Sequence, residues 1–256
     1  MPGEVTLSLA ALQSFLLVLT RVSFAFVFVP LPGARNAAEA PKVVFSLCVS
    51  LALLPFWHAL PSRDPGFGRL AGWILSEAAF GLTVGLAVAF LLEAFTLAAQ
   101  LLGLQAGYSY ASTIDPTNQS DTGVLQVVAQ LLAGMLFFTF GLDREVVRVF
   151  ARSLDVYPPG TFQLSLAHLG AIQHAGALMF ATALRLALPV IALLLLVDLA
   201  LALVGRVNSQ LQMLSLAFPA KMLGALAALG GLVAVFPPVF EKTARDSLGF
   251  LEGFLR

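Results

Sequence analysis

The sequence has little charge, one cysteine and three histidines, and each scarcity excludes a class of protein. Only 11% of its 256 residues are charged, whereas soluble domains average about 25%. Its formal net charge is zero, and no run of like charges marks a nucleic-acid-binding tail. The single cysteine, Cys48, excludes an intrachain disulfide and a cysteine-based metal site. Because Cys48 lies in an apolar run, we expect a small buried hydrophobe there.

Hydrophobic residues are abundant instead. They make up 59% of the chain, and the mean hydropathy is +0.92. Apolar runs recur, and about 20 residues suffice to cross a hydrocarbon core of about 30 Å. The N-terminus lacks the basic region of a cleaved signal peptide, so we expect the first run to be kept in the mature protein. The composition predicts an all-α integral membrane protein with about six hydrophobic helical segments.

The expected segments follow the apolar runs. They are 5–31, 43–60, 70–102, 124–141, 177–204 and 211–236. The third exceeds 30 residues, so it is either one long tilted helix or a helix that leaves the bilayer. Pro55 and Pro189 interrupt two runs and predict breaks or kinks. A charged helix is expected at 143–155, and a charged tail at 241–256.

Six charged residues fall inside the apolar runs. They are Arg21, Glu77, Glu93, Arg185, Asp198 and Lys221. A charge facing lipid is costly, so each is expected to face protein or water, and Arg21, Glu77 and Glu93 to tie helices together. If 205–210 closes a helical hairpin, Asp198 and Lys221 lie at about the same depth and can pair. Such a pair has two interpretations, a structural tie that sets the hairpin register or part of an ion pathway.

Two spacings on the expected helices predict how those helices pack. Gly81 and Gly85 are four residues apart, a spacing that lets two membrane helices approach closely. Arg144, Arg148 and Arg152 follow one another at the same interval, which places them on one face of the charged helix.

The stretch 103–123 differs from the apolar runs on both sides. It is polar, rich in glycine and hydroxyl groups, and contains no Lys or Arg. Tyr108, Tyr110 and Ile114 supply bulk, and Asp115-Pro116 can fix a turn. We interpret the stretch as a pore-lining or pore-closing loop, with a passive surface loop as the alternative.

No catalytic constellation is recognisable. Gly107-Tyr-Ser109-Tyr-Ala111 falls short of a Gly-x-Ser-x-Gly elbow, which also needs a strand before it. His168 and His174 are six residues apart and so do not form an i, i+4 metal pair on one helix face. We therefore expect no enzyme, no cofactor and no metal, and we interpret all three histidines, His58 included, as interfacial or loop residues.

An ordered set of residues runs along almost the whole chain. It comprises Arg21, Pro30, Gly33, Pro41-Lys42, Pro55, Gly107-Tyr-Ser-Tyr-Ala, Ile114-Asp115-Pro116, Leu188-Pro189-Val190, Asp198, Arg206-x-x-x-Gln210 and Phe218-Pro219-x-Lys221. In this order the chain resembles the FliR/SctT family of type III export-apparatus proteins, and the flagellar FliR branch more than the virulence SctT branch. Near the last turn the family pattern reads Arg-x-x-Pro-Gln-x-Asn. Here Ser209 replaces the proline and Gln212 the asparagine, so a less rigid turn is expected.

The resemblance implies an assembly in the bacterial inner membrane, at the flagellar basal body. One copy of this chain is expected beside several copies of FliP and FliQ homologues, forming a gate for unfolded export substrates, with FlhA and FlhB homologues nearby and no nucleic acid. It implies kinked helices, a FliP-like part at 1–160 and a FliQ-like hairpin and tail at 161–256. The residues implied in the pore plug are Gly107, Tyr108, Ser109, Tyr110, Ile114, Asp115 and Pro116. The turn containing Arg206, Ser209 and Gln210 is expected at the cytoplasmic entrance.

Two arguments predict opposite locations for the C-terminus. With six crossings, one face of the membrane carries Arg63, Arg69, Arg144, Arg148, Arg152, Lys242, Arg245 and Arg256, and the other carries Arg35, Lys42 and Arg206. The positive-inside rule then puts both termini in the cytoplasm. The resemblance puts the C-terminus on the periplasmic side, and we follow it because the charge rule presumes simple spanning helices.

Two other functions stay open. One is a virulence-type SctT subunit, which acts in the same kind of apparatus. The other is a secondary transporter with broken helices, a class that often shows two homologous halves.

Overall fold

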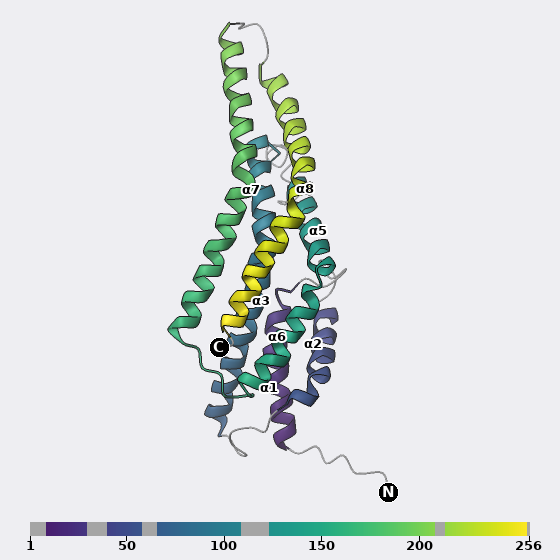
Figure 1. Cartoon of the computed structure of the whole chain (residues 1–256), viewed down its shortest axis with the longest axis vertical. Helices are drawn as coiled ribbons and strands as arrows, with labels where there is room; N and C mark the ends of the chain where they lie inside the picture. The colour runs from purple at the N-terminus through teal and green to yellow at the C-terminus, as the bar shows by residue number, and fades with distance from the viewer. Residues whose placement is uncertain (1–8, 30–39, 58–65, 109–122, 208–212, 255–256) are drawn as a thin grey trace. The chain divides into compact units, whose positions relative to one another are not determined.

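The structure is a computed structural model that describes residues 9–29, 40–57, 66–108, 123–207 and 213–254. The secondary structure of these residues is helical (Figure 1), which confirms the predicted all-α membrane protein. The elements are α1 (Leu9–Phe26), α2 (Ala40–Ala52), the 3-10 helix η1 (Leu54–Phe56), α3 (Phe67–Ala106), α5 (Val124–Thr139), α6 (Leu142–Val156), α7 (Leu166–Val207) and α8 (Met213–Phe254).

Three helices are longer than their apolar runs predicted. α3 is one unbroken helix of 40 residues, which fits both possibilities for the third segment, a tilted helix and a helix that leaves the bilayer. α7 begins eleven residues before the expected segment at 177–204, and α8 continues through the expected charged tail to Phe254. These boundaries were wrong because low hydropathy limits membrane insertion but does not end a helix. α7 and α8 also contain prolines, and α8 bends by 52° between Pro219–Gly231 and Val233–Gly253.

The expectation of six crossings is not confirmed. In the part of the chain that the structure describes, α3 and α7 are long and apolar enough to cross a membrane. The count rises to four if α5 with α6, and the two parts of α8, each form one span. α1 and α2 are shorter apolar helices. α2 ends at Ala52, and Pro55 lies in η1 just beyond it. The positive-inside argument counted Lys and Arg on the two faces of a membrane crossed six times. Because six crossings are not confirmed, that argument no longer supports a cytoplasmic location of both termini.

The chain forms two compact units, each assembled from separate stretches. The first comprises residues 1–89, 141–175 and 246–256. In it, α1 approaches α3 closely at Gly81 and Gly85. A Cβ on Gly81 would lie 2.0 Å from the carbonyl oxygen of Arg21, and one on Gly85 would lie 2.7 Å from that of Ala25. The spacing of these glycines therefore serves helix packing within the chain, as predicted.

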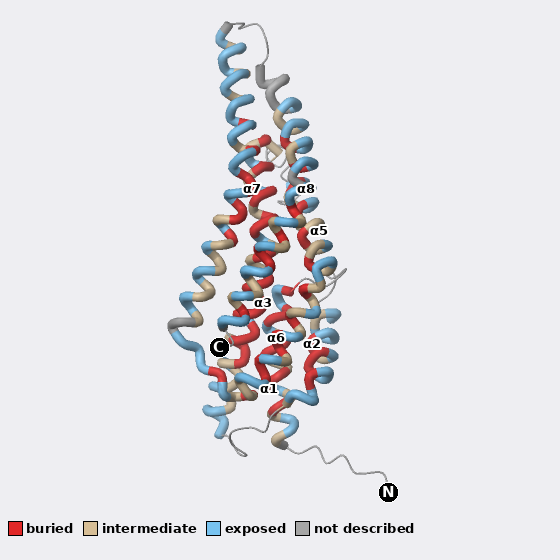
Figure 2. Tube along the Cα trace, in the orientation of Figure 1, coloured by how far each residue is buried: buried red, intermediate tan, exposed pale blue. Residues whose placement is uncertain are grey.

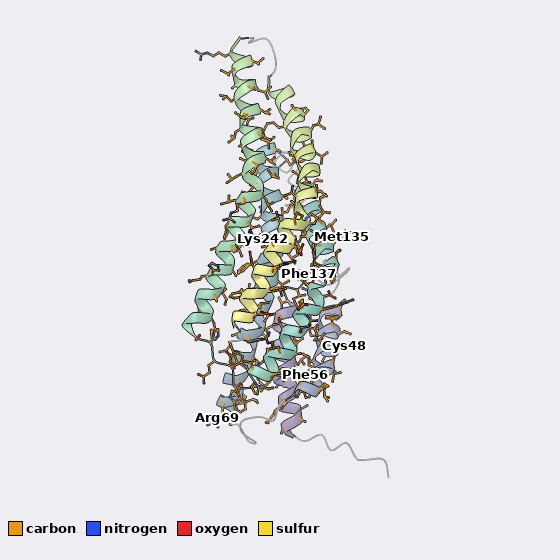
Figure 3. All side chains as sticks on the ribbon, viewed as in Figure 1. Cys48, Phe56, Arg69, Met135, Phe137 and Lys242 are labelled. Carbon is orange, nitrogen blue, oxygen red and sulfur yellow. The ribbon has the colours of Figure 1, made fainter. Side chains whose placement is uncertain are left out.

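α2 buries only one narrow face, formed by Ser46, Val49 and Ser50. Cys48, labelled in Figure 3, is exposed, so the expectation of a buried cysteine is wrong for this chain by itself. Its neighbours Val43 and Val44 are exposed as well, at 57% and 58%. An apolar run thus predicts nonpolar surroundings. It does not tell whether residues of the same chain, another protein or lipid provide them.

The second unit comprises residues 90–140 and 176–245. Phe95 of α3 is fully buried in this unit, with its ring centroid 5.2 Å from those of both Phe236 and Phe240 of α8. Many alanines of this unit are also buried. They are Ala94, Ala98, Ala99 and Ala106 of α3, Ala129 and Ala133 of α5, Ala183 and Ala187 of α7 and Ala225 of α8. Small side chains allow the close approach of helices that this packing requires.

Candidate functional site

The first unit contains a buried ion pair between α1 and α3. Arg21 Nε donates to Glu77 Oε2 at 2.5 Å, and neither side chain is more than 1% exposed. The guanidinium also donates to Ser153 Oγ and to the carbonyl oxygen of Tyr157, each at 3.0 Å. It lies 4.7 Å from the centroid of the Phe80 ring, within the range of a cation–π interaction. The buried charge of Arg21 is therefore matched by an acid, two further acceptors and an aromatic face.

The second oxygen of Glu77 completes the network. Glu77 Oε1 accepts a hydrogen bond from the backbone N–H of Gly160 at 2.8 Å. Gly160 has a φ of +82°, and a Cβ there would lie 2.9 Å from the Trp73 ring, so only glycine fits without strain. The network joins α1, α3, α6 and the turn after α6. The expected helix tie by Arg21 and Glu77 is confirmed, while Ser153, Tyr157 and Gly160 were not foreseen.

The second unit contains the pair expected from the hairpin register. Lys221 Nζ of α8 lies 2.9 Å from an Asp198 carboxylate oxygen of α7. Gln105 Nε2 of α3 donates to the same carboxylate at 3.3 Å. The Lys221 side chain is 15% exposed and that of Asp198 39%. Lys221 thus neutralises the Asp198 carboxylate within the same chain. A charged residue inside an apolar membrane segment needs such a partner.

The end of α3 lies beside this pair. Gly107 has a φ of +87°, and Tyr108 N donates to the carbonyl oxygen of Gly103 at 3.0 Å, a glycine-terminated helix end. α3 thus extends through Ala106, so the expected start of the loop at Gly103 was four residues too early. The Tyr108 hydroxyl donates to the carbonyl oxygen of Met222 in α8 at 2.9 Å. The stem of the expected loop is therefore hydrogen-bonded to the hairpin.

The other expected site residues divide into two groups. Glu93 on α3, Arg185 on α7 and Arg206 in the last turn of α7 are exposed. A cation in the last turn of a helix interacts favourably with the helix dipole. The remaining residues lie outside those that the structure describes. They are Ser109, Tyr110, Ile114, Asp115 and Pro116 of the loop and Ser209, Gln210 and Gln212 of the turn.

His168 and two of the three arginines on α6 make local polar contacts, and His174 is exposed on α7. His168 Nδ1 accepts the backbone N–H of Ser165 at 3.0 Å, a contact at the start of α7. On α6, Arg148 pairs with Glu145, and Arg152 lies 3.8 Å from Glu252 of α8. Over the described ranges, no three His, Cys, Asp or Glu residues gather where they could hold a metal ion. His58 lies outside those ranges.

Comparisons with known proteins connect this geometry to a family. Residues 12–247 match the family described as bacterial export proteins, family 1. The chain is 31% identical over 243 residues to the flagellar biosynthetic protein FliR of Pectobacterium carotovorum subsp. carotovorum, covering 94% of this chain and 90% of that protein. It is 28% identical over 224 residues to FliR of Escherichia coli (strain K12), covering 87% and 85%. It is also 26% identical over 228 residues to the surface presentation of antigens protein SpaR of Salmonella typhimurium (strain LT2), covering 89% and 84%.

Proposed function

The chain belongs to family 1 of the bacterial export proteins, the FliR/SctT family, and from this membership we propose that it is a subunit of a flagellar type III export gate. With FliP and FliQ homologues it forms the pore through which unfolded substrates cross the bacterial inner membrane. The match over residues 12–247 carries the proposal, because it includes α3 and α7 completely and α8 except for its last seven residues. The family consists of export proteins and not of enzymes. FlhA and FlhB homologues are the proposed neighbours at the flagellar basal body.

Exposed apolar surface supports an assembly inside a membrane. The apolar window of α7 has a mean hydropathy of 2.8, yet only 17% of it is buried within the chain. The corresponding window of α3 is 61% buried. Apolar surface left exposed on this scale marks an interaction site for protein or lipid. In the proposal, residues 1–160 take the place of a FliP protomer and residues 161–256 that of a FliQ hairpin, with one copy of the chain per gate.

Co-expression tests the assembly. We expect the chain, expressed together with FliP and FliQ homologues, to be purified as a hetero-oligomer and to have a defined mass by native mass spectrometry. Expressed alone, it should accumulate poorly, because its apolar faces remain uncovered. Recovery of only a stable, monodisperse monomer from the co-expressing cells would contradict the proposal.

The loop after α3 is proposed to close the pore when nothing is exported. Its bulk comes from Tyr108, Tyr110 and Ile114, and Asp115-Pro116 sets its turn. The hydrogen bond from Tyr108 to the hairpin supports this role, since it holds one end of the loop at a defined place within the second unit. The turn with Arg206, Ser209 and Gln210 is proposed to lie at the cytoplasmic entrance.

Deleting residues 110–120 tests the closing role. We expect the deletion complex to assemble but to admit small ions or dyes across the inner membrane, because the bulk that blocks the pore is missing. Tyr110→Ala should leak less, since it removes only part of that bulk. An assembled deletion complex as tight as the unmodified one would eliminate the role of the loop.

A virulence-type subunit is the second candidate, and the match to SpaR favours keeping it. Identification of the exported cargo separates the two: flagellar rod or hook proteins support the first, and secreted virulence proteins the second. No observation favours a transporter. Its two homologous halves would follow each other along the sequence, whereas the compact units here interleave.

A further inference from the structure

We propose that Gln105 is a positioning residue of the export gate: together with Tyr108 it anchors the end of α3 to both helices of the hairpin that α7 and α8 form. The inference rests on the proposed function for what the anchor controls, namely the loop that follows Tyr108. All the contacts that carry it lie within the second unit. It gives the ion pair of Asp198 and Lys221 a role beyond setting the register of the hairpin.

The end of α3 is a turn with a defined backbone geometry. Gly107 N donates to the carbonyl oxygen of Leu104 at 3.2 Å. Tyr108 N donates to that of Gly103 at 3.0 Å. These are the two hydrogen bonds of a Schellman motif, which requires a left-handed residue at the place where Gly107 has its φ of +87°. The motif turns the chain directly after the helix, so Tyr108 stays beside the last turn of α3, which carries Gln105.

The two side chains of this turn contact different helices of the hairpin. Gln105 Nε2 donates to Asp198 Oδ2 of α7 at 3.3 Å. The Tyr108 hydroxyl donates to the carbonyl oxygen of Met222 of α8 at 2.9 Å. Met222 directly follows Lys221, the partner of Asp198. Both contacts therefore join the end of α3 to the hairpin at the level of the ion pair, and α7 and α8 continue beyond this level (Figure 1).

Lys221 holds the acceptor that Gln105 uses. Lys221 Nζ lies 2.9 Å from each oxygen of the Asp198 carboxylate, and Oδ2 is the oxygen that also accepts from Gln105. A hydrogen bond to a charged acceptor is stronger than one between neutral groups. Because the ion pair already links α7 to α8, Gln105 adds α3 to this link without bringing in another charge. Removing the Gln105 amide leaves the carboxylate paired, so such a variant tests the anchor and spares the ion pair.

Buried side chains of the hairpin contribute little at this level. Leu194 is the last buried residue of α7 up to residue 206, and Ala225 is the first buried residue of α8 from residue 219 onward. Asp198 and Lys221 each lie four residues beyond these positions, about one helical turn. In Figure 2 this part of α7 is mostly pale blue. The two hydrogen bonds thus hold the end of α3 to a part of the hairpin that lacks an apolar core.

Hydrogen exchange in the assembled complex measures the anchor. Mass spectrometry follows the amides in the last turn of α3. We expect Gln105→Leu to raise their exchange about threefold, the factor for about 0.6 kcal/mol per interhelical hydrogen bond in a membrane protein. Gln105→Leu combined with Tyr108→Phe should raise it about ninefold, because the two factors multiply. Exchange in α7 around Asp198 should rise less, since Lys221 still holds that helix to α8.

Gln100→Leu is the matched control. Gln100 is exposed on the same helix and makes no hydrogen bond with the residues that the structure describes. We therefore expect its replacement to leave exchange at the end of α3 unchanged. Equal exchange in the assembled Gln105→Leu and Gln100→Leu complexes would refute the anchor.

Exchanging donor and acceptor separates a hydrogen bond from a packing effect. Gln105→Glu places a second carboxylate against Asp198 and should raise exchange more than Gln105→Leu does. Asp198→Asn deprives Lys221 of its carboxylate. The two substitutions together restore an amide opposite a carboxylate and keep one acid in the cluster, so exchange should return toward the wild-type rate. If the double variant instead shows the product of the two single effects, hydrogen bonding by Gln105 does not position α3.

Ion leakage through the assembled complex tests what the anchor controls. We expect Gln105→Leu to leak more than Gln100→Leu and less than the deletion of residues 110–120. If the deletion leaks but Gln105→Leu is as tight as Gln100→Leu, the positioning role is overturned. If the deletion itself is tight, the closing role of the loop in the proposed function fails, and the exchange measurement still decides whether Gln105 anchors α3.

Discussion

The buried pair of Arg21 and Glu77 is expected to be among the most sensitive positions of the chain. Arg21→Met keeps most of the side-chain volume but leaves the Glu77 carboxylate buried with the Gly160 N–H as its remaining hydrogen-bond donor in the network. Removing one member of a buried ion pair typically costs about 3–5 kcal/mol, because the other charge stays desolvated without its partner. We expect a loss of that size in the free energy of unfolding, and a similar loss for Glu77→Leu.

The double variant distinguishes a paired charge from a simple packing defect. With both charges removed, the Gly160 N–H and the Tyr157 carbonyl oxygen lose their partners in the network, but no charge stays buried. An unsatisfied neutral group costs about 1–3 kcal/mol. Arg21→Met combined with Glu77→Leu should therefore be more stable than either single variant. Arg148→Met is the matched control. Arg148 pairs with Glu145, but its side chain is 70% exposed, so we expect a loss below about 1 kcal/mol.

Unfolding in mixed micelles by added SDS measures these effects. Trp57 and Trp73 both belong to the first unit and report its unfolding by fluorescence. Protein accumulation in the membrane gives a second readout in cells. The reasoning is refuted if Arg21→Met costs no more than Arg148→Met, or if the double variant loses the sum of the two single losses.

Three further predictions concern packing, the hairpin pair and the loop stem. Gly81→Ala should lower the yield of folded protein in size-exclusion chromatography, since its Cβ would lie 2.0 Å from a carbonyl oxygen of α1. Gly103→Ala is the control, because no atom lies within 4 Å of its added Cβ. It should leave the free energy of unfolding unchanged or raise it by up to about 1 kcal/mol. Equal yields of the Gly81→Ala and Gly103→Ala proteins would contradict the packing argument. Asp198→Ala and Lys221→Ala should each reduce protein accumulation on immunoblots more than the charge-swapped double variant does. Equal accumulation of all three would show that this pair does not stabilise the protein. Tyr108→Phe should leave the complex assembled but raise ion leakage above the wild-type level, and leakage equal to wild type would show that this hydroxyl does not hold the loop.

The sequence by itself determined the class of the protein and the contacts that lie close along the chain. Its low charge and its apolar runs predicted an all-α membrane protein, because crossing hydrocarbon leaves few alternatives to helices. The pair of Asp198 and Lys221 was predictable because a short turn sets the register of a hairpin. Gly81 and Gly85 indicated close packing because their spacing follows from helix geometry.

The tertiary structure decided the contacts that join distant stretches. Arg21 meets Ser153 across 132 residues of sequence, and no local pattern indicates such a partner. Cys48 was predicted to be buried and is exposed, because an apolar run does not reveal whether its cover comes from the same chain. The extent of α7 was missed for a related reason: hydropathy governs where a helix enters a membrane, while backbone hydrogen bonds and the absence of breakers govern how far it continues.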